Sequence, residues 1–417
     1  MTKKSDAPAI RFKGFSDAWE QRKLGELVDR VVRKNTNNES TLPLTISAQY
    51  GLVDQITYFN NRVASRDVSN YYLVLNGEFA YNKSTSDGYP FGAIKRLDLY
   101  EKGVLSTLYI VFAPKKEQQI DSDYLTVFFD TDRWHKGVAE RAAEGARNHG
   151  LLNISAEDFF DIDLSVPKDI VEQKQIGAFI RQLDSLITLH QRKFEKLTNV
   201  KKSMLEKMFP QNGSSYPEIR FKGFTDPWEQ RKLGEMGQTY TGLSGKTKDD
   251  FGHGQARFVT YMNVFSNPIS NPEMTEPIEI DPKQNEVEVG DVFFTTSSET
   301  PEEVGMSSIL LEKRGKTYLN SFCFGFRPSE KIDSYYLAYM LRSESTRAKI
   351  ILLAQGISRY NISKNKVMEI AVSLPSLDEQ KMIGQYFSQL DNLITLHQRE
   401  LEKLQNIKKS MLEKMFV

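Results

Sequence analysis

The chain has 417 residues, of which 39% are hydrophobic and 26% are charged, and its 55 Lys plus Arg are balanced by 55 Asp plus Glu. These values are ordinary for a soluble globular protein of two to four domains, and the zero net charge gives no support for nucleic-acid binding through bulk basicity. The sequence has no run of about eighteen apolar residues, so no membrane span is predicted. Cys323 is the only cysteine, which excludes an intramolecular disulfide. A reducing cytoplasm is therefore the expected compartment.

Taken in chain order, the first predicted element belongs to a stretch of eighteen residues that occurs twice. Residues 10–27 read IRFKGFSDAWEQRKLGEL and residues 219–236 read IRFKGFTDPWEQRKLGEM, so fifteen positions are identical. A second stretch, residues 182–209, recurs at residues 389–416 with 23 of 28 positions identical. The offsets, 209 and 207 residues, are far longer than the period of a solenoid repeat. We conclude that one whole unit was duplicated and then changed mainly in its middle.

The two middle blocks, roughly residues 28–166 and 237–374, combine strand-like and helix-like patterns in the same order. The predicted strands lie at Leu108–Pro114 and Phe322–Pro328, and the predicted helices after them lie at Ser122–Trp134 and Ser334–Thr346. The shared order predicts one mixed α/β fold in both blocks, with loops that have diverged.

Each middle block is followed by a long predicted helix, because apolar residues recur there at steps of three and four. Capping sequences precede both helices, Asp169-Ile-Val-Glu172 in the first copy and Ser376-Leu-Asp-Glu379 in the second. Two near-identical apolar stripes can bury each other as a coiled coil; the alternative is that each helix packs only on its own half. The residues expected to pair are Leu183, Ile187, Phe194, Leu197, Met204, Leu390, Ile394, Leu401, Leu404 and Met411.

The sequence contains no catalytic motif and no metal-binding motif. Two Gly-Lys-Thr triplets, Gly245–Thr247 and Gly315–Thr317, lack the earlier glycine of a phosphate-binding loop, so both are predicted to be turns. HExxH, CxxC and GxSxG are absent, as is the Asn/Asp-Pro-Pro-aromatic tetrapeptide of amino-methyltransferases. His190 and His397 lie on the apolar stripes of the two predicted helices, so we expect them to pack between the helices and not to bind a metal. These features favour a binding protein without a cofactor over an enzyme.

Polar loops in the middle blocks carry side chains that can contact bases or phosphates. In the first half these are Asn82, Lys83, Ser84, Lys95, Arg96, Arg147 and Asn148. In the second half they are Thr295, Thr296, Ser297, Ser298, Arg359, Tyr360 and Asn361. For each residue taken singly, a loop that faces only water is the alternative interpretation.

The whole chain resembles the specificity subunit of type I restriction–modification systems. The resemblance rests on the alternation of divergent and constant blocks, on the Glu-Gln-Lys runs Glu172–Lys174 and Glu379–Lys381, and on residues 78–96 and 354–363, which are similar to the family's target-recognition domains. It implies an α+β fold, with two mixed α/β target-recognition domains separated by two long antiparallel helices that form a coiled coil with pseudo-two-fold symmetry. The implied domains are 1–166 and 211–374 for target recognition, and 167–210 and 375–417 as helical spacers.

The resemblance also implies what the chain binds. Each target-recognition domain would read one half of a split site in double-stranded DNA, and the constant helices would dock two modification subunits. Methyl transfer from S-adenosylmethionine, and ATP- and Mg-dependent translocation and cleavage, would then belong to the modification and restriction subunits. Two rival hypotheses remain open, namely a duplicated protein-binding scaffold without DNA affinity and a stand-alone methyltransferase or nuclease with a degenerate motif.

Overall fold

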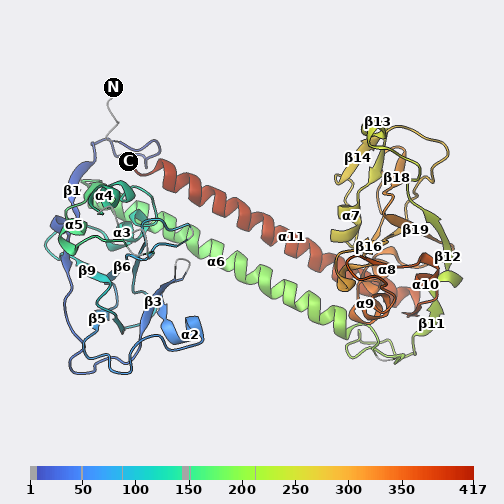
Figure 1. The fold of residues 1–417 in the computed structure, drawn as a ribbon, viewed down its shortest axis with the longest axis horizontal. Coiled ribbons are helices and arrows are strands. Elements are labelled where there is room, and N and C mark those ends of the chain that lie inside the picture. The colour runs from blue at the N-terminus through green and yellow to red at the C-terminus, as the bar shows by residue number, and fades with distance from the viewer. Residues whose placement is uncertain (1–6, 48–49, 87, 143–149, 151, 212) are drawn as a thin grey trace. The chain divides into compact units, whose positions relative to one another are not determined.

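The computed structural model describes residues 7–47, 50–86, 88–142, 150, 152–211 and 213–417. The chain divides into two compact units, the first comprising Met1–His190 with Glu400–Val417 and the second comprising Gln191–Arg399. Each unit contains part of both long helices, α6 (Ile170–Lys207) and α11 (Leu377–Lys414) (Figure 1). Because the division falls within these helices, the four-part division expected from the sequence remains an interpretation.

The first unit is built on a four-stranded antiparallel sheet with the strand order β2-β9-β6-β7. These strands are β2 (Val28–Arg30), β9 (Ile110–Pro114), β6 (Phe79–Asn82) and β7 (Ala93–Arg96). Further antiparallel pairs are β1 (Glu20–Lys23) with β10 (Asp163–Val166), β3 (Leu44–Ser47) with β4 (Gly51–Asp54), and β5 (Tyr72–Leu75) with β8 (Lys102–Leu105). The short helices are α1 (Leu24–Leu27), α2 (Gln55–Phe59), α3 (Ser122–Phe128), α4 (His135–Arg141) and α5 (Ala156–Phe160). Helices α3, α4 and α5 gather at one end of the unit, and α2, β3 and β5 lie at the other (Figure 1).

The second unit has an equivalent four-stranded sheet with the strand order β12-β19-β15-β17. These strands are β12 (Gly237–Thr241), β19 (Cys323–Pro328), β15 (Val292–Thr295) and β17 (Ser307–Ile309). The other strands are β14 (Thr275–Ile278), β13 (Phe251–Val259) and β18 (Thr317–Leu319) in one sheet, β11 (Glu229–Lys232) with β21 (Ala371–Leu374), and β16 (Ser297–Ser298) with β20 (Tyr360–Asn361). The short helices are η2 (Leu233–Glu235), η3 (Lys248–Asp250), α7 (Tyr261–Ser266), η4 (Pro301–Glu303), α8 (Ser334–Met340), α9 (Glu344–Ile351) and α10 (Lys364–Met368).

Equivalent strands follow the same order in both central sheets, so the prediction of one mixed α/β fold in two copies is confirmed. The predicted strands are present as β9 and β19, and the predicted helices begin as α3 and α8. Both helices end earlier than expected. Thr131 Oγ1 donates to Phe128 O at 2.6 Å, and Ser343 Oγ donates to Met340 O at 2.7 Å. In each case a hydroxyl satisfies a carbonyl at the helix end, where a further helical turn would otherwise supply the donor.

Both long helices begin directly after the predicted cap residues. Val171 N donates to Asp169 Oδ1 at 2.8 Å, and Glu379 N donates to Ser376 Oγ at 3.4 Å. A side-chain acceptor at this place satisfies one of the free amides of the first turn. The cap half of each predicted capping box is therefore present.

The other half of each box is replaced by an ion pair. Glu172 accepts from Arg11 Nε and Nη2 at 2.6 and 2.7 Å, and Glu379 accepts from Arg220 Nε and Nη2 at 2.7 and 2.8 Å. Among the described residues neither glutamate bonds back to its cap residue, so this part of the prediction is wrong. The reason is that the repeated opening stretch supplies a guanidinium, which matches both oxygens of a carboxylate.

Each core is completed by a phenylalanine two residues beyond the end of a long helix. In the first unit Phe416 packs against Trp19, and in the second unit Phe209 packs against Trp228, both with ring centroids 6.2 Å apart. All four rings are buried, and burying such a side chain stabilises a fold by roughly 1.5–3 kcal/mol. The recurrence of Met-Phe at the end of the second repeat therefore has a structural reason, because each core needs it.

Candidate nucleic-acid interface

Two polar stretches of the second half, singled out in the sequence, lie side by side in the second unit. Strands β16 and β20 pair antiparallel, with Ser297 opposite Asn361 and Ser298 opposite Tyr360. This pairing joins residues that are far apart in the sequence into one surface. Four of the seven residues predicted for this half are therefore brought together directly.

The stretch that carries Arg359 forms a tight hairpin. Gln355 N donates to Asn361 O at 3.0 Å, and Asn361 N donates to Gln355 O at 2.9 Å. Gly356 has a φ of +146°, and a Cβ there would lie 2.0 Å from Arg359 O, so the turn requires glycine. At its tip Ile357 is 96% exposed, and Arg359 is exposed beside it. The hairpin thus presents a guanidinium to solvent from a fixed backbone.

The other hydroxyl residues predicted here mainly hold the loops in place. Thr295 is fully buried, and its Oγ1 accepts from a backbone amide of the neighbouring loop at 3.0 Å. Thr296 Oγ1 donates to Phe322 O at 2.9 Å, and Ser298 Oγ donates to Glu303 Oε2 at 3.2 Å. These side chains position the surface more than they form it.

A pocket of about 250 Å³ opens beside this surface. It is lined by Tyr261, Met262, Phe265, Ser297, Ser298, Glu299, Glu303, Phe322 and Arg359. Tyr261 OH donates to Ser297 O at 2.7 Å, and the Tyr261 ring stacks on Phe265 with centroids 6.0 Å apart. Burial raises the pKa of Tyr261, so its hydroxyl remains a donor at neutral pH. Sequence reasoning missed the α7 residues and both glutamates, because no pattern in the sequence links α7 to the loop after β16.

The first unit repeats this arrangement with different residues. Lys83 Nζ donates to Ile154 O at 3.3 Å, and Leu152 N donates to Lys83 O at 3.0 Å. Thr85 N donates to Gly150 O at 2.6 Å. The loop after β6 therefore runs along residues 150 and 152–154, much as β16, after β15, runs along β20. Strands β6 and β15 hold equivalent places in their sheets.

Two other predicted residues form the start of this loop. Asn82 Oδ1 accepts from Ser84 N at 3.0 Å, and Ser84 is exposed. This short turn leaves the Ser84 hydroxyl at the surface. Arg147 and Asn148 lie outside the described residues, so their contacts remain predictions.

Lys95 and Arg96 are occupied by the fold of the first unit. Arg96 is 9% exposed, with Nε 2.7 Å from Asp98 Oδ1 and Nη2 2.8 Å from Asp123 Oδ1. Lys95 Nζ lies 2.6 Å from Asp130 Oδ1. Buried guanidinium groups are stable only when paired in this way, so Arg96 ties β7 to α3. We leave Lys95 and Arg96 out of the proposed interface.

In the first unit, the start of α6 packs against the end of α11. Leu183 lies in the same apolar cluster as Leu404 and Met411. Asp184 Oδ1 lies 2.6 Å from Lys408 Nζ. Residues of both helices thus share one apolar cluster within this unit.

In the second unit, the end of α6 packs against the start of α11. Leu390 lies in one apolar cluster with Leu197 and Met204, and Lys201 Nζ lies 2.5 Å from Asp391 Oδ1. This ion pair is the counterpart, at the repeat offset of 207 residues, of the pair in the first unit. The remaining residues predicted to pair are half-buried, namely Ile187, Phe194, Ile394 and Leu401.

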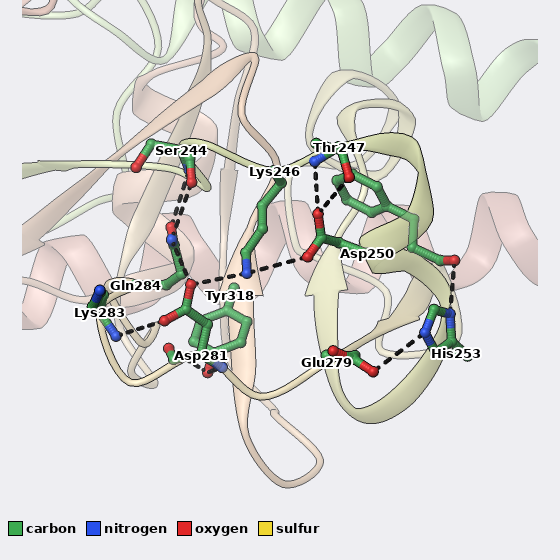
Figure 2. Close-up of polar contacts among 11 residues, drawn as sticks. Ser244, Lys246, Thr247, Asp250, His253, Glu279, Asp281, Lys283, Gln284 and Tyr318 are labelled. Atoms are coloured by element: carbon green, nitrogen blue, oxygen red, sulfur yellow. Dashed lines mark hydrogen bonds and ion pairs between the residues drawn. The ribbon is translucent and has the colours of Figure 1, made fainter.

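The first Gly-Lys-Thr triplet belongs to a polar cluster of the second unit, in which the lysine points between two carboxylates (Figure 2). Lys246 Nζ lies 2.8 Å from Asp281 Oδ2 and 3.7 Å from Asp250 Oδ1. Thr247 N donates to Asp250 Oδ2 at 2.7 Å. The hydrogen bond from Lys246 holds the pKa of Asp281 well below its usual range. The lysine thus ties two loops together, as expected of a structural turn.

Among the residues that the structure describes, no helix is long and apolar enough to cross a membrane. No group of three or more His, Cys, Asp or Glu among them could hold a metal ion.

Comparison with known proteins decides which family contains these repeated units. A model of the type I restriction modification DNA specificity domain matches residues 16–199 and again residues 225–406. The chain belongs to this family. Among its relatives, the type I restriction enzyme MjaVIII specificity subunit of Methanocaldococcus jannaschii is 24% identical, over 85% of this chain and 82% of that protein. The putative MjaX specificity subunit of the same organism is 23% identical, over 94% and 92%.

A solved structure of the type I restriction-modification S subunit from M. genitalium has a similar fold. The TM-score is 0.54 at 13% identity, and the match covers 99% of both chains. The resemblance inferred from the sequence is thus confirmed, as is the expectation of two repeated specificity domains of mixed α/β structure. This protein is the specificity component of a type I system, not a catalytic component.

Proposed function

We propose that this specificity subunit reads a split site in double-stranded DNA, with one unit on each half-site. The observation that carries the proposal occurs in both units. In each, the segment that follows an equivalent strand of the central sheet, β6 or β15, lies along a second polar stretch. Residues 83–85 run along residues 150 and 152–154, and Ser297–Ser298 pair with Tyr360–Asn361. Equivalent scaffolds that carry different side chains are what two different half-sites require.

DNA contacts should come from local groups, because the net charge is zero. The proposed contacts are Asn82, Lys83, Ser84, Arg147, Asn148, Ser297, Arg359, Tyr360 and Asn361. A lysine on a phosphate contributes affinity at every sequence, whereas an arginine on a base edge contributes discrimination at one base pair. Arg359, exposed on a rigid hairpin, is the better candidate for base reading.

We also propose that α6 and α11 pair antiparallel as a coiled coil. The support is the reversed order of their contacts: the start of α6 meets the end of α11 in the first unit, and the end of α6 meets the start of α11 in the second. The equivalent ion pairs Asp184–Lys408 and Lys201–Asp391 fit one pseudo-two-fold seam.

The same helices would dock two modification subunits. Leu186 and Leu189 are 39% and 45% exposed, and their counterparts Leu393 and Leu396 are 44% and 53% exposed. Exposed leucines at matching places of both repeats fit two copies of one partner. S-adenosylmethionine would then be bound by the modification subunits, and ATP and Mg by restriction subunits. With chromosomal DNA as ligand, the cytoplasm is the proposed compartment.

The test reconstitutes the system from purified subunits on DNA that carries the methylated motif of the host. Modification subunits with this chain should methylate a two-part motif, and either component alone should methylate nothing. Methylation of the same motif without this chain would contradict the proposal. Assembly with the partners but no DNA binding by the complex would favour the scaffold hypothesis instead.

A further inference from the structure

The pocket beside β16 contains charged groups that the fold does not use. Glu299 and Arg359 are exposed on its wall, and no ion pair of either is present among the described residues. Ser297 also lies on the wall, and its hydroxyl makes no hydrogen bond within the part of the chain that the structure describes. The pocket therefore presents unused polar groups to a ligand.

The acidic wall of the pocket is held rigidly. Arg347 of α9 donates to Glu302 O at 2.8 Å, to Val304 O at 2.7 Å and to Gly305 O at 2.7 Å. Burial lowers the pKa of Arg347 only to about 10, so it stays charged at neutral pH. One guanidinium thus fixes the backbone around Glu303, whose side chain is further held by Ser298. Groups fixed before binding lose little conformational entropy when a ligand arrives.

Carboxylates on a DNA-facing surface limit what can sit in this pocket. They repel phosphates, so Glu299 and Glu303 must meet base edges if this surface meets DNA. An ionised carboxylate only accepts hydrogen bonds. In the major groove, cytosine offers its N4 amino donor without an acceptor, whereas adenine places N7 beside its donor, and guanine and thymine offer only acceptors. Cytosine is therefore the base that suits a carboxylate.

The neighbouring groups fit the rest of the same base pair. A guanidinium pairs with O6 and N7 of guanine, and Arg359 lines the same pocket as the carboxylates. Met262 and Phe322 are 53% and 57% exposed and also line it, which offers apolar contact to the ring edge of a pyrimidine. The pocket thus combines carboxylate acceptors, a guanidinium donor and an apolar surface, which are the groups needed to read a C·G pair.

We propose that Glu299, supported by Glu303, reads the cytosine of a C·G pair in the half-site bound by the second unit, with Arg359 on its guanine. The assignment rests on the proposed function, because it takes this surface as the DNA-reading one. It makes Glu299 a determinant of specificity more than of affinity.

The experiment replaces single glutamates in the complete system and sequences the methylated motif in cells. Glu299→Gln should relax one C·G position of one half-site, because a glutamine amide also suits adenine. Discrimination at that position should fall about 5- to 150-fold, the equivalent of roughly 1–3 kcal/mol for one base contact. The other half-site should keep its sequence. Glu303→Gln should relax the same position more weakly.

The matched control is Glu302→Gln. Glu302 lies beside Glu303 in η4, and its carboxylate is exposed but does not line the pocket. This substitution should leave the motif unchanged. An unchanged motif with full methylation in Glu299→Gln would overturn the proposal, as would a change at an A·T pair only. If methylation is lost, the binding of the purified variant complex to oligonucleotides that differ at single positions of the motif is measured instead. A loss of affinity that is equal at all positions would also overturn the proposal.

Failure of the proposed function would look different. In that case the wild-type complex itself would show no two-part motif that depends on this chain. If only the present inference fails, the wild type methylates its motif and the glutamate variants keep every position of it. Glu299 is exposed and holds no ion pair among described residues, so thermal unfolding of the Glu299→Gln chain should match the wild type.

Discussion

At the scale of single residues, two buried ion pairs join the repeated opening stretch to the start of each long helix. The carboxylates of Glu172 and Glu379 are each 1% exposed beside Arg11 and Arg220. Arg220→Met would leave a buried charge without its partner, which destabilises folds by about 3–5 kcal/mol. The double variant Arg220→Met, Glu379→Met should recover most of that loss. Denaturant unfolding of the full chain measures both, and a single-variant loss below about 1 kcal/mol would refute the assignment.

The ion pair of Lys246 predicts a dependence of stability on pH. Because the pKa of Asp281 is lowered in the folded state, its stabilisation is fully present above the pKa of the unfolded chain, about 4, and is lost as pH falls through the folded pKa. The melting temperature of Lys246→Met should therefore lie below that of the wild type at pH 7, and the gap should shrink below about pH 4. Lys283→Met, at an exposed lysine nearby, is the control. A gap that stays constant with pH would contradict this linkage.

At the scale of elements, the long helices are the part of the fold that the sequence predicts best. Steps of three and four and a cap before each start locate α6 and α11 because both signals are local. The pairing of β16 with β20 had no such signal, since it joins segments far apart in the chain. The ion pair of Arg96 could not be predicted for the same reason, because its partner Asp123 lies on α3. Composition marks a polar loop, but only tertiary contacts decide whether its charges are already used.

The exposed leucines of the long helices give a prediction at this scale. Leu186→Glu with Leu189→Glu should remove one of two docked modification subunits, because a charge replaces apolar contact area of a partner site. The equivalent substitutions, Leu393→Glu with Leu396→Glu, should remove the other modification subunit. Native mass spectrometry of the assembled complex counts the subunits. Lys202→Glu and Lys409→Glu, at equivalent exposed positions, are controls that should leave two docked, and unchanged stoichiometry in both leucine variants would rule out these sites.

At the scale of the whole molecule, the duplication gives two readers, and the proposed coiled coil would set the gap between their half-sites. Four residues inserted after His190 and four after Arg399 leave every contact within a unit unchanged, because these are the unit boundaries. The insertion adds about 6 Å to each helix, close to the rise of one or two base pairs at about 3.4 Å each. The methylated motif should keep both tracts and gain one or two unspecified base pairs. An unchanged gap at full activity would show that the helices do not set the spacing.

The claim on which the account depends is that each unit reads its own half-site. The most direct measurement is the methylated motif of cells in which residues 28–153 have been exchanged for the same region of a relative with a known motif. That segment carries the described loop residues 83–85 and their neighbours Gly150 and Leu152, and it leaves the second unit untouched. The account predicts that one half of the motif takes the relative's sequence and the other half stays the same. A motif altered in both halves, or in neither while methylation persists, would contradict it.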